Sequence, residues 1–200
     1  KRKSKAAIAA TVRVVVGLGN PGAEYEQTRH NVGFEVVDAV AAWAGLAFRE
    51  GSGDFVIASG TASGNSFRLV KPLTYMNNSG QAVAEIVETH SLDIQDLLMV
   101  ADDFHLPLGA LRLRRRGSSG GHNGLSSVIF SLESEEIPRL RCGIGSPEMP
   151  KGRGGLVEFV LSRFTAEEER GAEAMILTAR DAVIAVITET IETAALRFSS

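Results

Sequence analysis

Hydrophobic residues along the chain form short continuous runs that alternate with stretches of helical spacing. The run at residues 12–18 is rich in β-branched side chains, which predicts a buried central strand. Residues 32–46 repeat apolar side chains at helical spacing, and Asn31 precedes them as a candidate N-cap. Two further runs, at residues 55–60 and 67–70, flank a polar turn and predict a β-hairpin.

The second half of the chain continues this alternation of strands and helices. The pattern predicts helices over residues 78–90 and 125–132, and strands at residues 97–101, 110–116, 139–144 and 157–161. A helical region in one or two pieces is expected from an N-cap at Thr165 to about residue 196. Such alternation is typical of an α/β fold, and the hairpin makes the sheet mixed. We therefore expect residues 11–200 to form a single α/β domain with helices flanking a mixed β-sheet, preceded by a disordered basic lead-in at residues 1–10.

Composition narrows the class of protein without fixing its function. The 200 residues carry a formal net charge of −3 and are 44% hydrophobic, which argues against both a histone-like polycation and a solvated acidic chain. No uncharged apolar stretch reaches the length of about 18 residues that a membrane span needs. The chain has one cysteine, Cys142, so it cannot form an intrachain disulfide, and we expect a cytoplasmic protein.

The small net charge conceals an uneven distribution. Residues 105–163 contain nine basic and five acidic residues, whereas residues 14–104 are strongly acidic. The densest basic cluster outside the N-terminus consists of Arg112, Arg114, Arg115 and Arg116. These arginines form either a solvated strand face or a strip that contacts phosphates.

A glycine-rich turn follows the first predicted strand. Residues 17–22 read Gly-Leu-Gly-Asn-Pro-Gly, which matches the G-x-G-x-x-G pattern of dinucleotide-binding loops. The segment after it is polar rather than helical, and Pro21 removes an amide that a phosphate would need. We therefore favour a tight turn that holds Asn20 at the carboxyl edge of the sheet, where α/β proteins usually form their sites. An NAD- or flavin-dependent oxidoreductase is the weaker interpretation.

One histidine and one carboxylate are candidates for acid–base chemistry. His30 lies just before a predicted helix, and Asp102 ends a predicted strand at the sheet edge. A histidine beside a carboxylate is the minimal general base, because the carboxylate fixes the tautomer and stabilises the imidazolium. On sequence alone, a solvated or capping His30 is the simpler interpretation, and nothing shows that the two residues meet.

Two loops carry clusters of carboxamides. Residues 77–80 read Asn-Asn-Ser-Gly, and residues 120–124 read Gly-Gly-His-Asn-Gly. These amides either cap the helices that follow or line a cleft that suits a peptide or ester. The chain lacks a G-x-S-x-G nucleophile elbow, and its four histidines lack metal-ligand spacing, so we expect neither a serine nucleophile nor a metal.

Taken together, these motifs resemble bacterial-type peptidyl-tRNA hydrolases. The likeness runs in order from about residue 12 to residue 165, and its specificity comes from the series rather than from any one motif. The matching segments are residues 15–22, Tyr25 with residues 28–33, residues 71–77, residues 79–80, Val100 with residues 102–103, residues 117–118, residues 120–125 and residues 139–146.

The resemblance implies hydrolysis of the ester that joins a peptide to the 3′ end of tRNA, by a monomer without metal or cofactor. It implies that His30 is the general base that activates water, that Asp102 orients it, and that Asn20 positions water and substrate. It further implies that Tyr25, Tyr75, Asn77 and Asn123 bind the substrate. By weaker analogy, Lys151 and Arg153, together with the arginines at 112–116, would face tRNA phosphates.

One departure from the family pattern is visible. The family's run after the catalytic aspartate usually places a second aspartate where this chain has His105, and Phe104 and Ala101 are also unusual. Asp102 itself is present, so activity is expected. Similarity to plant organelle splicing factors of the same family leaves a non-catalytic RNA-binding protein as the main alternative.

Overall fold

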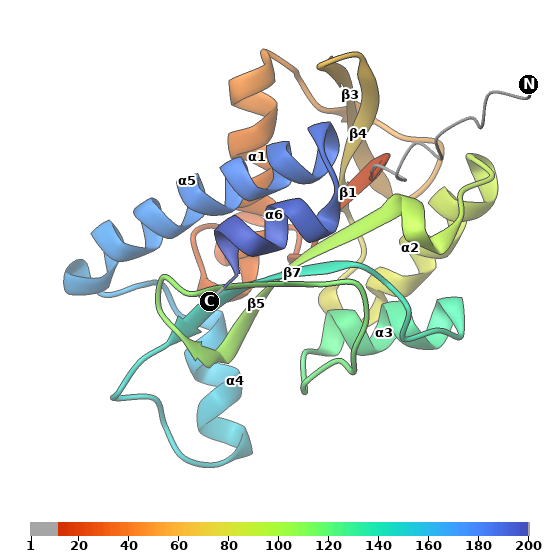
Figure 1. Ribbon diagram of the computed structural model, residues 1–200. Helices are drawn as coiled ribbons and strands as arrows, with labels where there is room; N and C mark the ends of the chain where they lie inside the picture. Colours follow the sequence, from red (N-terminus) through yellow and green to blue (C-terminus); the bar gives the residue numbers. More distant parts are fainter. Residues whose placement is uncertain (1–11, 200) are drawn as a thin grey trace, which may run out of the picture.

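The protein is described here by a computed structural model in which residues 12–199 are placed, so the expected lead-in at residues 1–10 lies outside the described residues. Within residues 12–199 one sheet runs in the order β2-β3-β4-β1-β5-β7-β6 (Figure 1). The strands are β1 (Val14–Gly17), β2 (Arg49–Glu50), β3 (Phe55–Ala62), β4 (Asn65–Pro72), β5 (Leu97–Pro107), β6 (Leu111–Arg114) and β7 (Arg139–Gly145). The short 3-10 helices are η1 (Ala23–Tyr25), η2 (Arg29–Asn31), η3 (Met76–Asn78) and η4 (Ile94–Asp96).

The sheet is mixed, as the hairpin in the sequence predicted. Strands β4, β1, β5 and β7 run parallel, whereas β2, β3 and β6 pair antiparallel with their neighbours. The β3–β4 turn is tighter than expected: Ala62 pairs with Asn65, so only Ser63 and Gly64 connect the strands. Both connecting residues have positive φ, which matches the twist of a two-residue hairpin.

Helices cover both faces of the sheet. The first face carries α1 (Val32–Ala44), α5 (Ala166–Thr188) and α6 (Ile191–Phe198), and the second carries α2 (Ser79–Thr89) and α3 (Asn123–Leu132) (Figure 1). Alternate residues of the central strand β1 belong to the two cores, with Val15 on the first side and Val14 and Val16 on the other. This burial on both sides explains why the strand appears in the sequence as a continuous apolar run.

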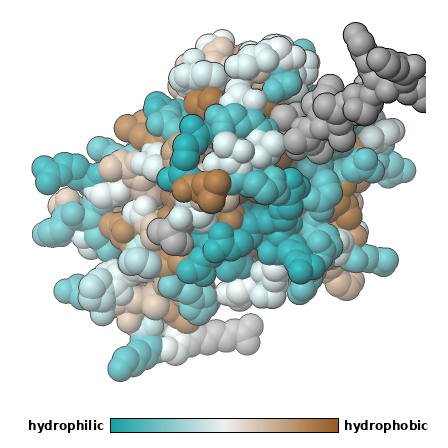
Figure 2. All heavy atoms as spheres, in the orientation of Figure 1, coloured by the Kyte–Doolittle hydropathy of each residue, from teal (hydrophilic) through white to brown (hydrophobic). Residues whose placement is uncertain are grey.

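The outer surface is mixed in character. Figure 2 shows hydrophilic side chains over much of one face, with hydrophobic side chains scattered among them rather than gathered in one patch. Phe130 and Leu196 are the most exposed large apolar residues, and they lie on different helices. Among the described residues, no helix is long and apolar enough to cross a membrane.

The strand expected at residues 157–161 was wrong, because this segment belongs to helix α4 (Arg153–Leu161). A short apolar run bears no clear period, so strand and helix are hard to distinguish by pattern alone. Gly152 takes φ +99° and ends the preceding loop, after which the chain coils. Figure 1 shows α4 beyond the ends of β5 and β7, where it contributes no strand to the sheet.

The end of strand β5 and the role of Asn31 differ from the expectation. Strand β5 does not stop before Asp102 but continues through it, pairing Asp102 with Cys142 of β7. Its other neighbour, β1, ends earlier, at the pairing of Gly17 with Val100. Asn31 does precede α1, but its side chain makes no capping hydrogen bond and instead binds the backbone of Asn20.

The start of α1 lies unusually close to the sheet. A Cβ atom added at Gly33 would lie 2.4 Å from the carbonyl oxygen of Leu18 and 2.5 Å from that of Val100. Both neighbours are backbone atoms, so they cannot rotate away as a side chain would. The absence of a side chain at Gly33 therefore lets η2, which precedes α1, approach the ends of β1 and β5.

We expect Gly33→Ala to lower the free energy of unfolding by about 2 kcal/mol or more, because the added methyl group forces backbone to move in a close-packed site. Gly154→Ala is the matched control, since a Cβ there meets no atom within 4 Å. The control should be neutral or stabilising by roughly 0.5 kcal/mol, as expected for alanine in a helix. Denaturant unfolding of both variants measures the difference, and equal stabilities would contradict the close-packing argument.

Candidate active site

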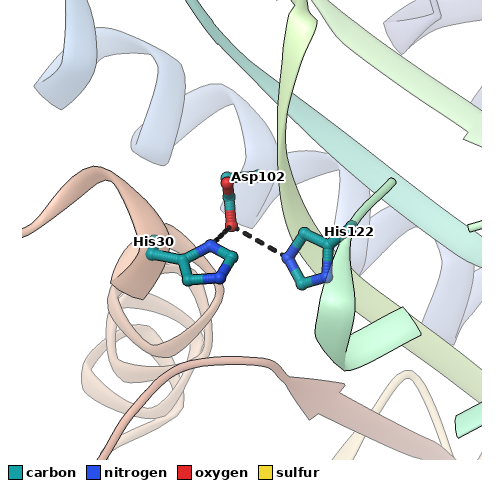
Figure 3. Close-up of side chains that lie close together, drawn as sticks. All are labelled: His30, Asp102 and His122. Atoms are coloured by element: carbon teal, nitrogen blue, oxygen red, sulfur yellow. Dashed lines mark hydrogen bonds and ion pairs between the residues drawn. The ribbon is translucent and has the colours of Figure 1, made fainter. Parts of the chain in front are cut away.

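Three polar side chains meet beyond the carboxyl end of β1. His30 comes from η2, Asp102 from β5, and His122 from the residue that precedes α3. His30 Nδ1 lies 2.8 Å from Asp102 Oδ1, and His122 Nε2 lies 3.0 Å from the same oxygen (Figure 3). All three residues are buried. The structure thus joins the predicted pair His30 and Asp102 and adds a second histidine.

The hydrogen bonds determine where the protons lie. The backbone N–H of Leu125 donates to His122 Nδ1 at 3.1 Å, so the neutral ring carries its proton on Nε2 and donates it to Asp102. His30 likewise donates from Nδ1 to Asp102, because an ionised carboxylate only accepts. Its other nitrogen, Nε2, points away from the carboxylate (Figure 3) and has no hydrogen-bond partner among the described residues. Nε2 is therefore the basic atom of the site.

The pKa values of Asp102 and His30 depend on each other's charge. Burial alone would raise the pKa of Asp102, but the charges and hydrogen bonds of His30 and His122 outweigh it and hold that pKa well below its usual range. Burial is also the largest single influence on His30, and it lowers the pKa. The charge of Asp102 and its hydrogen bond together exceed that effect, so the pKa of His30 is raised.

Asn20 is fixed in one orientation by its neighbours. Its backbone N–H donates to Asn31 Oδ1 at 2.8 Å, and Asn31 Nδ2 donates to its carbonyl oxygen at 3.0 Å. Its side-chain Oδ1 accepts from the backbone N–H of Met76 at 2.8 Å. Because a backbone amide can only donate, the oxygen of Asn20 must face Met76, which leaves Nδ2 free to donate into the adjoining cavity.

Two cavities meet at His30. The first, of about 460 Å³, reaches from His30 and Asp102 along residues 119–123 to Arg141. The second, of about 310 Å³, contains Asn20 together with the aromatic rings of Tyr25 and Tyr75. The residues that line both cavities are His30, Asn123, Val157 and Val160. His30 thus lies on the boundary between the two cavities.

The other predicted substrate-binding residues gather around the second cavity. Tyr25 and Tyr75 form an edge-to-face pair with ring centroids 6.3 Å apart, and Tyr75 is 58% exposed. Asn77 lies in η3, and Asn123 begins α3. The structure therefore brings all seven predicted site residues to one region, although they come from four separate segments of the chain.

Sequence reasoning overlooked several residues of this site. His122 lies in the amide-rich loop and in a segment that matches the family, but the sequence pattern alone assigns it no role in the site. Arg141, which pairs with Asp103 at 3.0 Å and lines the first cavity, was hidden inside a predicted strand. Val157 and Val160 also line the cavities, and the strand expected at residues 157–161 gave no sign of this role.

The same three side chains are the group of described residues that could hold a metal ion, with their ligand atoms within 4.8 Å of one another. To bind a metal through Nε2, His122 would have to carry its proton on Nδ1. That proton would face the backbone N–H of Leu125, which already donates to this atom. The hydrogen-bond pattern therefore suits protons rather than a metal between these groups.

Comparison with known proteins assigns the chain to a family. Residues 14–200 match the family described as "Peptidyl-tRNA hydrolase". The chain belongs to this family. It is 45% identical over 187 residues to the peptidyl-tRNA hydrolase of Chloroflexus aggregans and 41% identical over 186 residues to that of Thermoanaerobacter sp. strain X514, in each case covering 93% of this chain and 98% of the relative.

A solved structure of the family has the same fold. The crystal structure of peptidyl-tRNA hydrolase from Acinetobacter baumannii superposes with a TM-score of 0.90 at 30% sequence identity, covering 98% of both chains. This agreement confirms the α/β class and the mixed sheet. The glycines at 17–22 fit the tight-turn interpretation. A Cβ at Gly17 would lie 2.2 Å from the carbonyl oxygen of Gly33, and residues 12–31 of the structure contain no α-helix.

The coupling of His30 to Asp102 predicts how the pH profile of hydrolysis responds to mutation. A general base must be neutral to accept a proton, so with His30 in the expected role the rate should rise with pH through its raised pKa, at higher pH than for an ordinary histidine. In Asp102→Asn the stabilising charge is gone, so the midpoint should move to lower pH while the plateau falls by about 10²-fold or more. An unchanged midpoint in the pH–rate profile would contradict this coupling.

The effect of Asp102→Asn on folding also depends on pH. The lowered pKa of Asp102 contributes stability above the carboxyl's unfolded value, which is lost as pH falls through the folded value. The raised pKa of His30 contributes stability at low pH that is lost as pH rises through its folded value. At neutral pH we expect Asp102→Asn to lose more free energy of transition-state stabilisation, measured from kcat/KM, than free energy of unfolding, measured with denaturant. Equal losses in the two free energies would make Asp102 a structural residue only.

Proposed function

We propose that this protein hydrolyses the ester between a peptide and the 3′ end of tRNA, with His30 as the general base that activates water. The observation that carries the proposal is the free Nε2 of His30, whose opposite nitrogen is hydrogen-bonded to the buried carboxylate of Asp102. Membership of the peptidyl-tRNA hydrolase family supports the substrate class. The non-catalytic RNA-binding alternative lacks such support, because the matched relatives are hydrolases.

The reaction needs one proton relay and no covalent intermediate. His30 Nε2 takes a proton from water as the water oxygen attacks the ester carbonyl carbon. Asp102 stabilises the imidazolium that forms, and His122 donates a second hydrogen bond to the same carboxylate oxygen. When the tetrahedral intermediate collapses, the C–O bond to the ribose breaks, and the imidazolium returns the proton to the leaving oxygen. The products are free tRNA, which translation can reuse, and the released peptide.

The two cavities suggest where each half of the substrate lies. The ester must reach His30, where the cavities meet, so the nucleotide and the peptide extend in different directions from it. Asn20 Nδ2 is placed to donate to the substrate or to the attacking water, because its Oδ1 is already held by Met76. Asn77 and Asn123 offer further amides, and Tyr25 and Tyr75 offer aromatic surface for the terminal nucleotide and the peptide.

The lining of the second cavity favours blocked substrates. A free aminoacyl-tRNA carries an ammonium group, whereas a peptidyl-tRNA has a neutral amide in its place. The described lining of this cavity includes amides, aromatic rings and valines but no carboxylate. An ammonium entering it would lose water without gaining a counter-charge, which is unfavourable.

The tRNA backbone is proposed to contact the basic strip at the β6 edge of the sheet. Arg112 of β6 lies directly opposite Arg141 of β7 in an antiparallel pair. Arg141 already has Asp103 as a counter-charge at 3.0 Å, so a bound phosphate would chiefly neutralise Arg112. Arg112 has no hydrogen-bond or ion-pair partner among the described residues, so it remains available to such an anion.

The other predicted phosphate contacts are less free. Arg115 makes a two-bond pair with Glu192 of α6, which lowers the pKa of Glu192 to about 2, and Arg116 pairs with Glu136 at 3.2 Å. Arg114 donates to Ser199 Oγ at 3.0 Å. These contacts are exposed and weak enough for phosphate to compete with them. Lys151 is exposed in the loop before α4, and the Arg153 side chain lies outside the described part of the structure.

Three further parts of the proposal concern the setting of the enzyme. The chemistry above assigns every proton transfer to His30, so we propose that no metal or other cofactor takes part. We also propose that the enzyme acts as a monomer, since both cavities are built by one chain. A translation substrate and a single buried cysteine favour the cytoplasm as its location.

Turnover of N-acetylated aminoacyl-tRNA by His30→Ala tests the role of the base. We expect kcat to fall by about 10²–10⁴-fold, the usual contribution of a general base, while tRNA binding persists. His90→Ala is the matched control, because His90 lies at the far end of α2. Near-normal turnover by His30→Ala would overturn the mechanism, and binding without hydrolysis by the wild type would support the RNA-binding alternative.

The salt dependence of KM tests the basic strip. Arg112→Gln should weaken binding and reduce the slope of log KM against log salt by about one unit, as expected for the loss of one phosphate contact. Arg49→Gln provides the control, since Arg49 is exposed on β2 at the opposite edge of the sheet. A KM that does not change with salt in the wild type would contradict phosphate binding at the strip.

A further inference from the structure

Arg29, the residue immediately before His30, is almost completely buried, with an exposure of 3%. Its guanidinium donates to the carbonyl oxygen of Arg163 and forms an ion pair with Glu168. The guanidinium carbon also lies 4.4 Å from the ring centroid of Phe159 and 4.8 Å from that of Phe164. One side chain thus contacts the end of α4, the connection that follows it and the first turn of α5.

The backbone reinforces this attachment. The N–H of Arg29 donates to the carbonyl oxygen of Ser162 at 2.9 Å, and Thr28 forms an antiparallel bridge with Arg163. Glu168 is fixed in turn, because its carboxylate also accepts from the backbone N–H of Thr165 at 2.9 Å in the capping box of α5. The segment that carries the base is therefore tied to the segment that joins α4 to α5.

Helix α4 depends on this connection for its place over the site. Its main contact with another element of the fold is with η2, the short helix of Arg29 and His30. Val157 and Val160 on α4 line both cavities, so the position of the helix sets the width of both binding spaces. Phe159, on the same helix, is the residue that meets the Arg29 guanidinium.

We propose that Arg29 is a positioning residue: its bonds to Arg163 and Glu168 hold α4 at the distance from His30 that the peptide ester requires. The inference rests on the proposed site at His30 but assigns to Arg29 no part in the proton transfer. Its guanidinium faces the α4–α5 connection, whereas His30 faces Asp102.

Stability alone is a poor explanation for this arrangement. A buried ion pair contributes little net free energy of folding, because both charges lose water, and apolar residues of similar size often serve as well. The Nε atom of Arg29 even lacks a hydrogen-bond partner among the described residues. What a planar guanidinium supplies beyond stability is direction, because it bonds a carbonyl and a carboxylate at fixed angles at the same time.

Two substitutions at Arg29 test the proposal through the split between KM and kcat. Arg29→Met removes the charge, and Arg29→Lys keeps the charge but loses the planar fork. Both should raise KM for N-acetylated aminoacyl-tRNA by about tenfold and change kcat by less than about threefold, because the wall of the cleft moves while the base stays intact. The pH–rate midpoint should stay at the wild-type value.

A variant at Glu168, the ion-pair partner of Arg29, tests the proposal independently in case the Arg29 variants fail to fold. Glu168→Gln retains the size of the side chain and an oxygen that accepts from Thr165, but it removes the anion that Arg29 binds. KM should rise in this variant too, by a smaller factor, and the double variant with Arg29→Met should be no worse than Arg29→Met alone. Arg197→Met is the matched control, since Arg197 pairs with Glu189 and lies over the ring of Phe198 on α6.

Amide hydrogen exchange supplies a readout that does not depend on catalysis. Exchange in α4 should accelerate in the Arg29 and Glu168 variants while β1 and β5 keep their protection. Folded variants with wild-type KM and unchanged exchange would overturn the proposal, as would a fall in kcat with no change in KM. If His30→Ala instead retained turnover, the mechanism would fail, yet the effects on exchange and KM would still decide the role of Arg29.

Discussion

A carboxylate in a protein interior remains charged only if neighbouring groups replace the water that it has lost. Asp102 is 2% exposed, and the two histidines that donate to one of its oxygens supply that replacement. Each histidine needs a defined tautomer to do so, and the backbone of Leu125 fixes the tautomer of His122. The free nitrogen of His30, and thus the basicity of the site, follows from how this one buried charge is stabilised.

The meeting of these groups depends on a close contact between backbones. Asp102 lies on β5 past the end of β1, and this leaves room above β1 for a neighbouring segment. Gly33 lets the start of α1 fill that room, and the preceding turn delivers His30 to the carboxylate. Asn31, between them, fixes Asn20 rather than capping the helix. The packing of α1 on the sheet and the geometry of the site therefore both follow from the close approach of Gly33 to the ends of β1 and β5.

Much of the fold could be predicted from the sequence, because strong periodicity marks the core and the ordered motifs mark the family. The seven expected site residues lie in one region of the structure, and their roles stay predictions. The limits were physical. The segment at 157–161 is mostly apolar and too short for its period to distinguish a strand from a helix, so the pattern could not identify the helix. The loop that contains His122 marks it as a candidate, but its contact with Asp102, 20 residues away in the sequence, is not specified by any local pattern. The ion pair between Arg29 and Glu168 joins residues 139 positions apart, and no local sequence pattern predicts it either.

Strand β7 places Cys142 directly beside Asp102 in the sheet. Burial, and then the charge of Asp102, raise the pKa of this thiol far above its ordinary value, so it stays protonated. A protonated thiol without solvent access reacts slowly with oxidants and alkylating agents. The carboxylate that partners the proposed general base therefore lies next to the chain's single sulfhydryl, which burial shields from solvent. We expect the activity to tolerate oxidising conditions that inactivate enzymes with an exposed active-site cysteine.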